Sequence, residues 1–139
     1  MSLLHWLQAL EARLLALGLR VATDERADLY ADVERTVEQL QRRHAATKAC
    51  QESLRQACGW FLDDEQRVGE LEDAVRASTA AGDPAAALRS AVELEGARAA
   101  LACSRVRVER LRQAYENHHD EMTRLEYLLA GLQARLSPC

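Results

Sequence analysis

A stripe of mostly apolar residues, spaced alternately three and four positions apart, runs without exception through residues 94–136. Its members are Leu94, Ala97, Leu101, Ser104, Val108, Leu111, Tyr115, His118, Met122, Leu125, Leu129, Leu132 and Leu136. This spacing places every member on one face of an α-helix, and its repetition over several heptads is typical of a coiled coil. The pattern therefore predicts one long helix that packs its stripe against a second helix.

A short break at Gly82, Asp83 and Pro84 predicts where that second helix lies. Glycine suits the left-handed residue that ends a helix, aspartate is a favoured N-cap, and proline fits the first helical position. A connection this short returns the second helix alongside the first. The turn therefore predicts an antiparallel pair in which residue i faces roughly residue 165 − i, an estimate made about the turn.

The helix before the break, expected from about residue 24 to residue 81, carries a less regular stripe. Its members are Val33, Val37, Leu40, His44, Thr47, Cys50, Leu54, Ala57, Phe61, Val68, Leu71 and Val75. Aromatic residues make up 4% of the sequence and charged residues 29%, a composition typical of long helices. We expect an all-α fold: a short amphipathic helix in residues 1–22, then a long antiparallel coiled-coil hairpin in residues 23–137 with its turn at residues 82–84.

Several function classes find no support in the sequence. No phosphate-binding loop, nucleophile motif or metal-ligand spacing of cysteine and histidine is present, so we expect no enzyme activity, no cofactor and no metal. The adjacent His118 and His119 point about 100° apart on a helix and cannot bind one ion together. The net charge of −4 gives no indication of nucleic-acid binding. No apolar run approaches the roughly 18 residues of a membrane span, and no signal peptide is recognisable, so a cytoplasmic location is expected.

The arginine-rich stretch at residues 98–112 allows two interpretations. In the simpler one, the arginines lie on a solvated flank and pair with acidic residues of the other helix or of a neighbouring molecule, since the expected register places part of the acidic run at residues 63–73 opposite them. In the other, they form a surface that binds an acidic partner. The sequence leaves both open.

The first 20 residues form an amphipathic pattern that is able to lie in a lipid interface. The candidate membrane-binding residues are Leu3, Leu4, Trp6, Leu7, Leu10, Leu14 and Leu17, with Arg13 and Arg20 on the opposite side. Glu11 lies near the apolar edge, and two basic residues attract anionic lipid only weakly. The alternative is that this helix packs on its own hairpin or on a partner subunit.

The chain resembles the phage-shock-protein A / Vipp family, bacterial and plastid relatives of the ESCRT-III membrane-remodelling proteins. The resemblance is carried by three features: the amphipathic start, the restart ATDERADLYADVERTVEQL at residues 22–40, and the tip AVRASTAAGDPAAALRSAVELE at residues 74–95. The family usually has charged residues at the turn, where this sequence has Asp83 and Pro84. The family also continues through further helices, so the resemblance ends after the hairpin.

This resemblance implies a function in membrane maintenance. Residues 1–20 would correspond to the family's membrane-sensing helix and residues 24–136 to its hairpin, which packs side by side into oligomers. The implied partners are further copies of the chain, anionic membrane lipids and a regulatory protein, on the inner face of the cytoplasmic membrane under envelope stress. The alternative function is that of a cytosolic coiled-coil chaperone or stalk component of an export apparatus.

Overall fold

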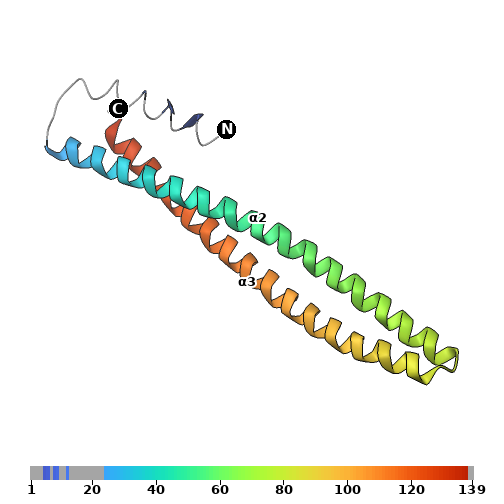
Figure 1. Cartoon of the computed structure of the whole chain (residues 1–139). Coiled ribbons are helices and arrows are strands. Elements are labelled where there is room, and N and C mark those ends of the chain that lie inside the picture. The colour runs from blue at the N-terminus through green and yellow to red at the C-terminus, as the bar shows by residue number, and fades with distance from the viewer. Residues whose placement is uncertain (1–4, 7, 10–11, 13–23, 138–139) are drawn as a thin grey trace. The chain divides into compact units, whose positions relative to one another are not determined.

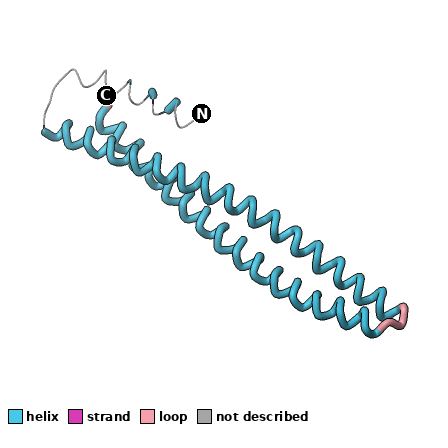
Figure 2. The backbone as a smooth tube through the Cα atoms, in the orientation of Figure 1, coloured by secondary structure: helices cyan, strands magenta, loops and turns pink. Residues whose placement is uncertain are grey.

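The computed structural model describes residues 5, 6, 8, 9, 12 and 24–137. Two long helices account for nearly all of these residues: α2 (Asp24–Ala80) and α3 (Pro84–Leu136). They pack against each other in a hairpin (Figure 1), and no strand occurs among the described residues. The expected all-helical hairpin is therefore confirmed. Figure 2 shows that the only loop between the two helices is the short connection at their junction.

The connection between α2 and α3 is built from paired helix caps. Gly82 has φ +70°, its amide N–H donates to the Thr79 carbonyl (3.1 Å), and the next amide, of Asp83, donates to the Ser78 carbonyl (3.0 Å). This pair of bonds is the Schellman arrangement, which requires a left-handed residue and therefore favours glycine. A carboxylate oxygen of Asp83 then accepts the Ala86 amide hydrogen bond (3.1 Å) as the N-cap of α3.

The chain divides into two compact units: unit 1, Met1–Ala45 with His119–Cys139, and unit 2, Ala46–His118. Unit 1 contains the larger apolar cluster. Its buried members are Val33, Leu40, Leu125, Leu129, Leu132 and Leu136, and the partly buried Trp6, Leu29, Tyr30, Val37 and Met122 pack against them. Leucine side chains from consecutive turns of α3 meet the stripe of α2 here, so this unit buries most of the large side chains.

Unit 2 has a thinner core made of smaller layers. Val68, Leu71 and Leu94 are buried, with Val75, Ala97 and Leu101 packed against them. Polar contacts fill other layers between the helices: the Ser104 hydroxyl donates to the Asp64 carboxylate, and the Cys50 thiol donates to the Leu111 carbonyl (3.5 Å). The unit therefore depends on polar contacts as well as on apolar burial.

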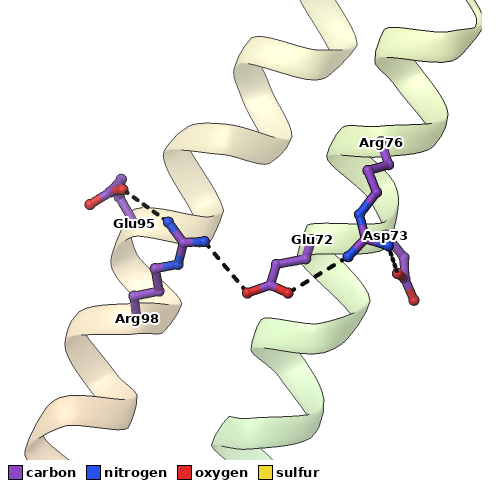
Figure 3. Close-up of polar contacts among 5 residues, drawn as sticks. All are labelled: Glu72, Asp73, Arg76, Glu95 and Arg98. Atoms are coloured by element: carbon purple, nitrogen blue, oxygen red, sulfur yellow. Dashed lines mark hydrogen bonds and ion pairs between the residues drawn. The ribbon is translucent and has the colours of Figure 1, made fainter.

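The register of unit 2 is visible in its ion pairs. Arg98 contacts Glu72 on the facing helix (3.5 Å), and Arg67 contacts Glu93 (3.1 Å). Both pairs lie within five positions of the expected register. Figure 3 shows that Glu72 also contacts Arg76 (3.9 Å) on its own helix, so the cross-helix pair belongs to a larger network. Exposed pairs of this kind each add only about 0–1 kcal/mol to stability. They nevertheless indicate which residues of the two helices face each other.

The two stripes occupy the interface almost as the sequence indicates. Every member of the α3 stripe is buried or half-buried. In α2 the exception is His44, which is exposed, whereas Thr47 one turn later is buried. An imidazole is costly to bury without a hydrogen-bond partner, so the threonine is the better interior residue of the two.

Candidate protein-binding groove

The candidate membrane-binding residues lie mostly outside the described part of the chain. Leu3, Leu4, Leu7, Leu10, Leu14 and Leu17, together with Arg13 and Arg20, are among the residues not described. Trp6 is described and helical, and it packs, partly buried, against the apolar cluster of unit 1. In the described residues, no helix has the length and apolar character needed to cross a bilayer.

The described residues also contain no grouping of three or more His, Cys, Asp or Glu side chains placed to hold a metal ion. His118 is half-buried at its stripe position, and His119 is exposed. Cys50 and Cys58 are half-buried and Cys103 is exposed, and all three are free thiols.

The arginine-rich stretch of α3 divides into two groups. The outer arginines are paired: Arg98 contacts Glu72 and Glu95, and Arg112 contacts Glu109 (2.7 Å) and Glu116 (3.4 Å). The hydrogen bond from Arg112 lowers the pKa of Glu109, and the same bond raises the pKa of Arg112. For these residues the simpler interpretation, a flank paired with acidic side chains, describes the structure.

The inner arginines differ. Within the described chain, Arg105, Arg107 and Arg110 take part in no ion pair with a carboxylate. The guanidinium carbon of Arg107 instead lies over the indole ring of Trp60, 4.8 Å from the ring centroid. This is a cation–π contact between α3 and α2. It holds the arginine beside an aromatic surface and leaves the charge without an anionic partner.

Trp60 of α2 and Arg107 of α3 both line an open groove of about 840 Å³ on unit 2. Its other α3 residues include Ala102, Cys103, Val106 and Arg110. Trp60 is 42% exposed and Val106 49% exposed, so large apolar side chains face water on both helices. The groove is open to solvent rather than enclosed, which suits another helix better than a small molecule.

The groove combines an aromatic ring, an exposed valine and two guanidinium groups without ion-pair partners among the described residues. Side chains of these types are able to bind an apolar side chain with a carboxylate beside it. Tryptophan and arginine are also the residues most enriched at energetically important positions of protein interfaces. Trp60 is not among the candidate residues predicted from the sequence. The expected register nevertheless places it opposite residue 105, within two positions of Arg107.

Comparison with known proteins assigns no family to the chain. No family model matches it. Neither the curated proteins nor the solved structures include a match. The resemblance to the phage-shock-protein A / Vipp family therefore stays a prediction, and the argument for function rests on the residues of the hairpin.

Proposed function

We propose that the protein is a non-enzymatic, self-associating coiled-coil hairpin that acts as an interaction module. The observation that carries this proposal is the exposed groove at Trp60, where apolar surface and unpaired arginines occur together. Further large apolar side chains of unit 2 are exposed as well, among them Leu62, Leu88 and Val92. Exposed apolar surface rimmed by charges is typical of protein–protein contact sites.

The thin core of unit 2 supports the same proposal. Two helices alone bury little surface for their length, and small domains gain stability when copies or partners cover their remaining apolar side chains. Sedimentation velocity over a concentration series tests the proposal: the sedimentation coefficient is expected to rise with concentration. A single monomeric species up to high micromolar concentration would contradict it.

The second part of the proposal concerns residues 1–22, which we assign to a short amphipathic helix that binds anionic membrane surfaces from the cytoplasmic side. Its support is the leucine stripe of the sequence, since burying each leucine contributes up to about 1.5–3 kcal/mol. In this proposal the protein helps to maintain the membrane under envelope stress. Trp6 packs against the apolar cluster of unit 1. Insertion of this helix into lipid therefore replaces the contacts of Trp6 with the cluster by contacts with lipid.

Vesicle flotation tests the membrane part. Wild-type protein is expected to float with anionic vesicles, and the double variant Leu10→Glu/Leu14→Glu is expected to stay in the dense fraction, because the charges prevent insertion of the stripe. The matched control is Leu88→Glu/Val92→Glu, which adds the same charges to exposed positions of the hairpin outside the membrane-binding segment. Equal flotation of all three proteins, or of none, would contradict a lipid-binding role.

The chain has two tryptophans, so a variant with Trp60→Phe reports on Trp6 alone. In this variant, the proposal predicts a change of tryptophan emission when anionic vesicles are added. The change is expected to disappear when Leu10→Glu/Leu14→Glu is introduced into the same background. An emission spectrum that is insensitive to vesicles would show that Trp6 keeps its contacts with the hairpin.

A further inference from the structure

We infer that the Trp60 groove binds a second copy of this chain, through a patch on the opposite face of α2 that is centred on Leu62. The inference rests on the self-association proposed above and specifies its surface. We call the first surface the groove, with Trp60, Val106, Arg107 and Arg110, and the second the Leu62 patch, with Cys58, Leu62, Glu65 and Gly69.

The two surfaces lie on opposite faces of the same helix. Trp60 and Leu62 are two residues apart, which is about 200° around an α-helix and only about 3 Å along its axis. Both side chains are exposed, Trp60 at 42% and Leu62 at 63%. One copy can therefore present its Leu62 patch to the groove of the next when the two hairpins lie side by side in opposite directions, which brings Glu65 toward the levels of Arg107 and Arg110.

The shapes of the two surfaces are complementary. Leu62 stands between small residues on its own face, with Cys58 one turn before it and Gly69 two turns after it. The space around the glycine is open, since no atom outside the neighbouring backbone of its own helix lies within 4 Å of the position a Cβ would take. The lining of the groove includes the small side chains of Ala102 and Cys103 as well as larger ones. A protruding leucine that enters a hollow of this kind is the knob-into-hole contact of packed helices.

The charges match in the same way. Glu65 lies one turn after Leu62 on the same face, is exposed, and takes part in no ion pair within the described residues. Arg107 and Arg110 are likewise without a carboxylate partner there. A leucine followed by a glutamate meets a groove with an apolar wall and two arginines. Because the chain itself carries this acidic apolar patch, a second copy is the occupant that the charges favour over an unrelated partner.

A contact between two different faces is heterologous, and it leaves one groove and one Leu62 patch free at the ends of any pair of copies. Such contacts extend into rings or open chains. They also make a specific prediction that a symmetric contact does not make. A copy with a defective groove and a copy with a defective Leu62 patch still form one contact with each other.

Sedimentation velocity of four proteins tests the inference: wild type, Trp60→Ser, Leu62→Ser, and the control Leu88→Ser. Leu88 is 67% exposed and lies outside both surfaces, so its variant is expected to associate like wild type. Each of the other two variants is expected to be monomeric where wild type is oligomeric. An equimolar mixture of Trp60→Ser and Leu62→Ser is expected to form dimers that do not extend further. Circular dichroism checks that each variant keeps its helical content.

A charge exchange provides the second test. Arg110→Glu and Glu65→Arg are each expected to weaken association about tenfold or more, and the double variant is expected to recover it, because each copy then carries both exchanged charges. Arg105→Glu, outside the groove, is the matched control. Association of all variants like that of wild type would overturn this surface while leaving self-association intact. A monomeric wild type would overturn self-association itself, and the surface with it.

Discussion

The Ser104 hydroxyl of α3 donates a hydrogen bond to the Asp64 carboxylate of α2 between the helices of unit 2. Both residues are half-buried: Ser104 belongs to the α3 stripe, and Asp64 lies between the stripe residues Phe61 and Val68 of α2. A carboxylate at such a position needs a hydrogen-bond donor, because a partly buried polar group without a partner is costly. The pair therefore forms a polar layer whose two members depend on each other.

Removing one member of this pair is expected to cost more than removing both. Ser104→Ala leaves the Asp64 carboxylate without its donor and is expected to lower the free energy of unfolding by about 1 kcal/mol or more. Asp64→Leu combined with Ser104→Ala is expected to recover this loss, because two apolar side chains then meet at the stripe. Urea unfolding followed by circular dichroism measures both changes. A double variant less stable than Ser104→Ala would contradict the prediction.

The turn provides a second prediction. Gly82→Ala places a Cβ at φ +70° and is expected to destabilise the hairpin by about 1–2 kcal/mol, the cost of a left-handed conformation for an ordinary residue. The control is Gly96→Ala in the interior of α3, where the new methyl group meets no atom within 4 Å. That substitution is expected to stabilise the helix by about 0.5–1 kcal/mol. Thermal unfolding of the two variants should shift in opposite directions.

Two adjacent leucines of α3 test the apolar cluster of unit 1. Leu129 is fully buried and Leu128 is 46% exposed. Leu129→Ala is expected to lower the free energy of unfolding by about 2–5 kcal/mol, because it leaves a cavity in the cluster. Leu128→Ala removes the same atoms from a partly solvated position and is expected to cost well under half as much. Similar losses in both variants would indicate that the cluster is not the main source of stability.

Acidic pH is expected to lower the free energy of unfolding, because it protonates glutamates that take part in exposed ion pairs. The hydrogen bond from Arg112 lowers the pKa of Glu109, and the hydrogen bond from Arg124 lowers the pKa of Glu121, to which the charge of Arg43 on the facing helix also contributes. A folded-state pKa below the ordinary value of 4.5 stabilises the fold above that pH. The stabilisation is lost as the pH falls through the lowered values.

The variant Glu109→Gln/Glu121→Gln measures this effect. Its free energy of unfolding is expected to depend less steeply on pH below about pH 4.5 than that of wild type. The control Glu25→Gln/Glu126→Gln removes two exposed glutamates that take part in no ion pair among the described residues, and it should keep the wild-type slope. An unchanged slope in the first variant would show that these pairs contribute nothing to stability.

The helical hairpin is predictable from local sequence signals alone. The three-and-four spacing of residues 94–136 and the Gly82–Asp83–Pro84 break are local signals, because helix periodicity and capping depend on residues only a few positions apart. The approximate register followed from the position of the turn. The same local reasoning does not distinguish His44, which is exposed, from Thr47, which is buried.

Side-chain pairing across the two helices depends on how the helices pack and is not predictable from local signals. The sequence shows an arginine-rich stretch, but only the packed helices separate Arg98 and Arg112, which have carboxylate partners, from Arg107, which lies on Trp60. The packing of Trp6 against unit 1 also joins residues far apart in the sequence. The physical reason is that such contacts depend on where long side chains end after the helices pack, and a shift of one turn changes the partner.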